Sequence, residues 1–129
     1  LLKNAQLYFD AARLNISSVK VNGETVSYKV IGDVLEVLPH LVTKVDAKTK
    51  KTSTTVKNRA AGETLKVEIR YSTRPDAGVY FVQEANAYPA QTTVVFTQGE
   101  MEDTRYWLPT YDSPNDKATS EGIIRVPAN

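Results

Sequence analysis

The chain of 129 residues contains no cysteine and a single histidine, His40. The lack of cysteine excludes disulfides and thiolate metal sites, and it leaves the compartment (cytoplasmic, periplasmic or secreted) undetermined. One imidazole excludes any zinc site that needs two histidines from this chain. A Ser-His-acid triad could use only His40, which follows Pro39 at the end of an apolar run, so we interpret it as a structural or exposed residue.

Long apolar runs and an excess of one charge are also missing. No run approaches the roughly 18 apolar residues that mark a candidate membrane-spanning helix. The 16 basic and 15 acidic residues give a net charge of +1, which provides no overall field for nucleic acid or a membrane surface. The length fits one domain with a modest core.

Helical periodicity is absent as well, and alternation of apolar and polar residues takes its place. No stretch has the apolar spacing of an amphipathic helix of three turns. Short alternating runs separated by turn signals indicate an all-β fold, with an antiparallel, saddle-like or sandwich-type sheet. The expected strands are 14–21, 25–30, 34–38, 65–71, 79–82, 92–97 and 120–126.

Three local features sharpen this prediction. In Leu65–Tyr71 every second residue is apolar, which is typical of a strand with one buried and one wet face. The apolar phase of Leu14–Val21 slips in its middle, and a bulge at Ser17–Ser18 would explain the slip. Asn22-Gly23 follows directly and predicts a tight hairpin.

A lysine-rich segment, 43–62, differs from the rest of the chain. It holds six basic residues against the lone acid Asp46, which leaves 10 basic and 14 acidic residues elsewhere, a net charge of −4. A phosphate-binding patch or a contact with an acidic partner would use such a segment. No aromatic residue interleaves the lysines to stack on bases. We interpret it as a long, solvated hairpin extension or loop.

The segment 97–116 is long, irregular, acidic and aromatic. Its acids could bind calcium or form a paired-carboxylate site, but their spacing matches neither a helix-loop-helix calcium loop nor any particular glycosidase arrangement. The plainer interpretation is that they pair with Arg105 and Lys117 and cap turns. These residues alone indicate a β-rich domain with an unusual ordered connection at 98–119.

The amino-acid sequence of that connection resembles one family. It reads TQGE at 97–100, DTRYWLP at 103–109 and DSPNDKAT at 112–119. This is similar to the N-terminal β domain of the aminopeptidase N family of zinc metallopeptidases, where Thr-Gln-x-Glu is followed by an arginine, an aromatic residue, Phe-Pro-Cys-x-Asp-x-Pro and Ala-Thr. The hairpin SVKVNG at 18–23, GETL at 62–65 and GVYF at 78–81 fit the same family in order.

The resemblance implies a role for the chain in a larger enzyme. Residues 1–129 would be part of the N-terminal domain of an aminopeptidase that removes N-terminal residues from peptides. The zinc motif His-Glu-x-x-His and the Gly-Ala-Met-Glu-Asn motif do not occur here, so no catalytic residue, metal site or cofactor is expected in this chain. Zinc would belong to the parent protein.

The resemblance also implies residues and partners. Gln98 would line the pocket for the first side chain of the substrate, and Glu100 would receive its protonated α-amino group. Arg105, Trp107 and Asp112 would support the connection, with Arg105 paired to Asp112 or Asp103. The expected partners are the catalytic domain of the same protein and the N-terminus of a peptide, without nucleic acid or a membrane span.

Some residues depart from the family pattern, and other functions stay open. Leu108 and Thr110 stand where phenylalanine and cysteine are common, and the lysine-rich segment is longer than expected. A relative that has lost its zinc motif would use the same domain as an interaction scaffold. A stand-alone β-sandwich binding module would only mimic the motif.

Overall fold

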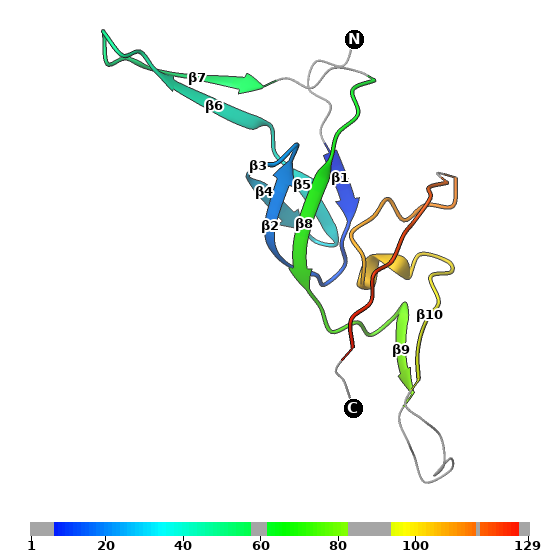
Figure 1. The fold of residues 1–129 in the computed structure, drawn as a ribbon. Coiled ribbons are helices and arrows are strands. Elements are labelled where there is room, and N and C mark those ends of the chain that lie inside the picture. Colours follow the sequence, from blue (N-terminus) through cyan, green and yellow to red (C-terminus); the bar gives the residue numbers. More distant parts are fainter. Residues whose placement is uncertain (1–6, 58–61, 83–93, 116, 127–129) are drawn as a thin grey trace.

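The protein is all β, as the alternation predicts. The computed structural model describes residues 7–57, 62–82, 94–115 and 117–126, and these form ten strands and one short 3₁₀ helix (Figure 1). Every strand pair is antiparallel.

Two three-stranded sheets form the body of the domain. One has the order β1 (Leu7–Asp10), β5 (Val34–Val37), β4 (Tyr28–Ile31). The other has the order β3 (Glu24–Thr25), β2 (Asn15–Val21), β8 (Val67–Ser72). The core lies between them as in a sandwich, because both sheets contribute apolar side chains to one buried cluster. Its buried members are Ala11, Leu14, Val19, Val21, Val26, Leu35 and Val37.

The local features of the second sheet agree with the sequence. Along β8 the apolar residues are half-buried and pack on the core, while Glu68 and Arg70 are exposed. The register of β2 against β8 shifts between Ile16 and Ser18, which confirms the bulge. Asn22 and Gly23 both have positive φ, 51° and 84°, as a type I′ hairpin requires.

The expected single strand at 25–30 is wrong, because the chain changes sheets there. β3 ends at Thr25 in one sheet and β4 begins at Tyr28 in the other. Val26 is only 6% exposed and enters the core between the two sheets. Because Val26 is buried between the sheets, the backbone bends there and passes from one sheet to the other. The apolar–polar alternation of the sequence therefore continues through 25–30, although the strand is interrupted.

Two hairpins extend from the body in different directions (Figure 1). The lysine-rich hairpin pairs β6 (His40–Val45) with β7 (Thr52–Lys57), and every residue of β7 is exposed. The second hairpin, which we call the apolar ribbon, pairs β9 (Val79–Val82) with β10 (Val94–Thr97). The predicted strand 92–97 is thus observed from Val94, and its first two residues lie outside the described part.

The last predicted strand, 120–126, is not formed. These residues have no strand assignment, and Ile123, Ile124 and Val126 are 84%, 88% and 78% exposed. A strand needs a neighbour for its backbone N–H and C=O groups, and none of the described strands pairs with this segment. The apolar residues of this segment predicted a strand, but no described strand lies beside it to pair with its backbone.

No helix in the described part of the chain has the length and apolar content to cross a bilayer.

The buried position of Leu35 gives a test of the sandwich core. Leu35 is fully buried between the sheets, so Leu35→Ala should lower the free energy of unfolding by about 2–5 kcal/mol. Ile31→Ala is the matched control, since Ile31 is 63% exposed and should change stability by less than about 0.5 kcal/mol. Urea unfolding of both variants measures the difference, and equal losses would contradict the described core.

Candidate functional site: the acidic turn and its support

The connection from Gln98 to Thr119 is attached directly to the first strand. It contains the 3₁₀ helix η1 (Thr104–Tyr106) and packs beside the sandwich (Figure 1). Thr110 forms an isolated antiparallel bridge with Asp10. The Asp10 N–H donates to the Thr110 carbonyl at 2.7 Å, and the Thr110 N–H donates back at 3.1 Å. The segment is thus irregular in outline but fixed by backbone hydrogen bonds.

Arg105 and Asp112 hold the two sides of the connection together. The Asp112 carboxylate accepts hydrogen bonds from the Arg105 backbone N–H at 3.0 Å and from its Nε at 3.3 Å. The Arg105 Nη2 also donates to the Asp112 carbonyl at 3.2 Å. Of the two acids expected to pair with Arg105, the structure pairs Asp112.

Two further acids complete this cluster. Asp10 accepts from the Asp112 N–H at 2.9 Å and lies 3.8 Å from Arg105 Nη1, and Glu102 accepts from Arg105 Nη2 at 2.8 Å. Partial burial opposes the charge on the guanidinium, yet the hydrogen bond to Asp112 and the charges of Asp10 and Glu102 raise the pKa of Arg105 above its ordinary value. We call Asp10, Glu102, Arg105 and Asp112 the arginine cluster.

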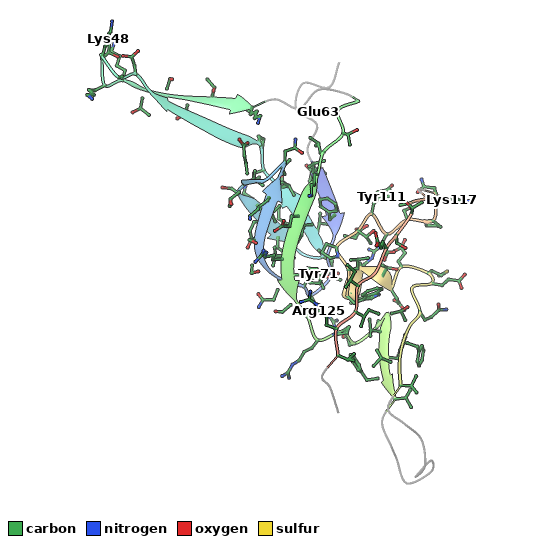
Figure 2. All side chains as sticks on the ribbon, viewed as in Figure 1. Lys48, Glu63, Tyr71, Tyr111, Lys117 and Arg125 are labelled. Atoms are coloured by element: carbon green, nitrogen blue, oxygen red, sulfur yellow. The ribbon has the colours of Figure 1, made fainter. Side chains whose placement is uncertain are left out.

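The carbonyls of η1 and of the residue after it provide a second attachment to the body. The Arg105 carbonyl accepts from the Ala12 N–H at 3.0 Å. Thr73 Oγ1 donates to the Tyr106 carbonyl at 3.2 Å, and the Tyr71 hydroxyl donates to the Trp107 carbonyl at 2.8 Å. Burial raises the pKa of Tyr71 (labelled in Figure 2), so its hydroxyl keeps the proton that this hydrogen bond needs.

Trp107 packs closely against the start of the apolar ribbon. Gly78 has a φ of +79°, and a Cβ at this position would overlap the Asp103 carbonyl oxygen and approach Trp107 Cδ1 to 2.7 Å. Only glycine combines that backbone conformation with this close approach. The indole Nε1 is buried, and no hydrogen-bond acceptor for it is present among the described residues.

The turn that carries Gln98 and Glu100 is fixed at its backbone while its two side chains are exposed. The Gln98 N–H donates to the Gly78 carbonyl, and the Asp103 N–H donates to the Gly99 carbonyl, both at 3.0 Å. Gly99 lies so close to Thr104 Oγ1 that a side chain there would clash. Among the described residues, none makes a hydrogen bond or ion pair with the side chain of Gln98 or Glu100. We call residues 98–103 the acidic turn.

An open depression of about 630 Å³ adjoins this turn. Its lining residues are Asp33, Met101, Glu102, Asp103, Arg105, Tyr106 and Pro114. Its acids outnumber its single arginine, so it would favour a cation over an anion. In the described part of the chain, no group of three histidine or carboxylate side chains is arranged to hold a metal ion.

The arrangement includes residues that sequence reasoning missed. Asp10 is bonded to a residue 102 positions later, and no local pattern signals that contact. Asp33, in the Gly32-Asp33 turn, also lines the depression. The structure places Gln98, Glu100, Arg105, Trp107 and Asp112 on one connection, while their roles toward a substrate stay predictions.

Comparison with known proteins identifies this arrangement of sheets and connection. The sequence model of the peptidase M1 N-terminal domain matches residues 2–129. The chain belongs to this family. The resemblance carried by the 97–119 segment is therefore confirmed for the M1 peptidases as a family.

A solved structure supports the same fold for this M1 N-terminal domain. The chain is similar to the structure of yeast LTA4 hydrolase in complex with bestatin, with a TM-score of 0.56 and 15% sequence identity. The match covers 85% of this chain and 16% of that chain, so the domain spans a small part of the solved protein. A search of curated proteins finds no match.

The arginine cluster gives a stability prediction for this M1 domain. Asp112→Ala should lower the free energy of unfolding by about 1–3 kcal/mol, because it leaves the Nε and the backbone N–H of Arg105, both in a partly buried place, without their shared acceptor. Glu102→Ala removes only an exposed ion pair and should cost less than about 1 kcal/mol. Thermal unfolding of the two variants measures the difference, and a larger loss for Glu102→Ala would refute the assigned order.

Proposed function

We propose that this chain is the non-catalytic N-terminal domain of a zinc-dependent aminopeptidase, and that its acidic turn binds the free α-amino end of a peptide. The observation that carries this proposal is the exposure of Gln98 and Glu100 on a turn whose backbone is held at both ends. Membership of the M1 peptidase family supports a peptidase as the parent protein. The nearby acidic depression supports a cationic ligand.

A carboxylate at this position would distinguish peptide ends from internal peptide bonds. An ammonium group donates a charge-assisted hydrogen bond to a carboxylate, which is stronger than a neutral one. An internal peptide bond offers no ammonium, so the carboxylate would be desolvated without a partner, at a cost of roughly 1–3 kcal/mol or more. Glu100 would thereby favour exopeptidase cleavage although it takes no part in bond breaking. Gln98 offers a donor and an acceptor to the first side chain.

Such discrimination requires a rigid support. A binding group must be held within roughly half an ångström of its productive position. The arginine cluster, the packing of Trp107 on Gly78 and the hydrogen bonds to the η1 segment all restrain the backbone that leads to Glu100. Arg105, Trp107 and Asp112 therefore act as positioning residues in this proposal.

The reaction itself would use groups from the catalytic domain of the parent. Zinc bound there would activate the attacking water. The described residues of this chain offer no donor set for that ion, so their part is to bind and orient the substrate end.

The apolar ribbon supports docking of this domain onto another domain of the parent. Phe81, Val95 and Phe96 are 60%, 54% and 48% exposed, and Tyr80 stacks on Phe96 with ring centroids 5.1 Å apart. In the ladder, Phe81 pairs with Val95 and Tyr80 with Phe96, so both faces of the ribbon are apolar. A ribbon in water normally keeps one polar face. Gln98 directly follows β10, so docking of this ribbon would also fix the acidic turn.

Because the proposal places the catalytic groups in another domain, the isolated chain should be inactive. Incubation of the pure 129-residue chain with zinc and an aminoacyl chromogenic substrate should give no turnover. In the proposal, the zinc ligands and the catalytic base lie in the catalytic domain of the parent protein. Chelator-sensitive turnover by the pure chain would refute this assignment.

The role of Glu100 is tested in the full-length parent. Glu100→Gln should lower kcat/KM for an unblocked aminoacyl substrate by roughly 1–3 kcal/mol of transition-state stabilisation, since a charged partner of the ammonium is lost. Glu121→Gln is the control, because Glu121 is exposed and lies outside the acidic turn. An unchanged kcat/KM for Glu100→Gln would remove this residue from the substrate site.

A further inference from the structure

The end of the β6–β7 hairpin concentrates positive charge, whereas the rest of the chain taken together is acidic. Residues 43–62 hold six basic residues and one acid, and the rest of the chain has a net charge of −4. The hairpin extends outward from the sandwich, and Lys48 lies at its far end (Figures 1 and 2). We propose that this end is an electrostatic contact site for the surface of an acidic lipid bilayer.

The cations at the tip are available to a partner. Lys48, Lys50 and Lys51 are exposed. Within the part of the chain that the structure describes, no ion pair engages their side chains, whereas Lys57 at the base of the hairpin pairs with Glu24 at 3.2 Å. Three unpaired ammonium groups within four residues thus form one compact positive end.

The single acid of the segment folds the turn and does not neutralise a lysine. The Asp46 carboxylate accepts hydrogen bonds from the Thr49 N–H at 2.7 Å, the Thr49 hydroxyl at 2.9 Å and the Lys48 N–H at 3.0 Å. The hydrogen bond from the Thr49 N–H, together with the other two, lowers the pKa of Asp46 below its ordinary value. The Lys50 N–H donates to the Asp46 carbonyl at 3.0 Å and closes the turn. The turn therefore presents its lysines in a defined place.

The length of the hairpin separates this charge from the sandwich. Six residue pairs connect the base to the turn, which corresponds to roughly 20 Å at about 3.3 Å per residue. The Debye length at physiological ionic strength is about 8 Å. A surface that the tip touches is therefore largely screened from the charged side chains of the sandwich.

The placement of the lysines favours a planar, fluid surface. Three lysines lie at the turn, whereas β6 and β7 hold one lysine each, Lys44 and Lys57, and Lys57 is paired with Glu24. A ribbon that follows a nucleic-acid groove would need cations along its length to neutralise successive phosphates. The tip also lacks arginine forks and aromatic side chains, which shape-specific or base-stacking sites use. Point charges on flexible stems suit lipid headgroups that rearrange laterally.

The test is vesicle binding by the full-length protein that carries this chain. The probes are phosphatidylcholine vesicles with 0 or 30 mol% phosphatidylserine, and co-sedimentation measures partitioning. We expect phosphatidylserine-dependent binding that weakens between 50 and 300 mM salt. The variant K48Q/K50Q/K51Q should bind at least about tenfold more weakly, since each lysine near an anionic surface contributes a several-fold factor.

Two matched variants separate the tip from general charge. K29Q/K66Q/K117Q removes the same net charge from exposed positions outside the hairpin and should bind like the wild type. K48R/K50R/K51R keeps the tip charge and should retain binding. Absence of phosphatidylserine-dependent binding, or equal losses in the two glutamine variants, would overturn the proposal. Tighter binding to a 20-base-pair DNA duplex than to the vesicles would also overturn it. None of these outcomes depends on peptidase activity.

Discussion

The Arg105 guanidinium joins two acids of its own connection to one acid from the start of the chain. Asp10 ends the first strand, Glu102 lies in the acidic turn, and Asp112 lies beyond η1. Because the Arg105 side chain is only 21% exposed and that of Asp112 only 10%, these charges are more constrained than an ordinary surface pair. The connection therefore holds one conformation although it contains almost no regular secondary structure.

The remaining features follow from that fixed connection. The connection is bonded to β1 through Thr110, and the carbonyls of residues 105–107 accept hydrogen bonds from Ala12, Tyr71 and Thr73. It can therefore expose Glu100 without loss of order. The apolar ribbon leads into the same turn through the Gln98–Gly78 hydrogen bond. Docking of the ribbon and placement of the carboxylate would then be one structural event in the parent protein.

Local features of the fold could be predicted from the sequence, whereas long-range ones could not. The alternation of 65–71 and the Asn22-Gly23 turn depend on neighbouring residues and are confirmed. The split at Val26 depends on burial between two sheets, and the failure of 120–126 depends on a missing partner strand. For the site, Arg105 was expected to pair with Asp112 or Asp103, and the structure pairs it with Asp112. The roles of the acidic turn came from resemblance, since composition alone does not identify a ligand.

In the proposed function, Glu100 interacts with the α-ammonium of a peptide. A double-mutant cycle measures this directly, with the binding of a competitive inhibitor and its desamino analogue to the full-length wild type and to Glu100→Gln. We expect a coupling free energy of about 1–3 kcal/mol between the carboxylate and the amino group. A coupling energy of zero, with both ligands weakened equally or not at all, would contradict it.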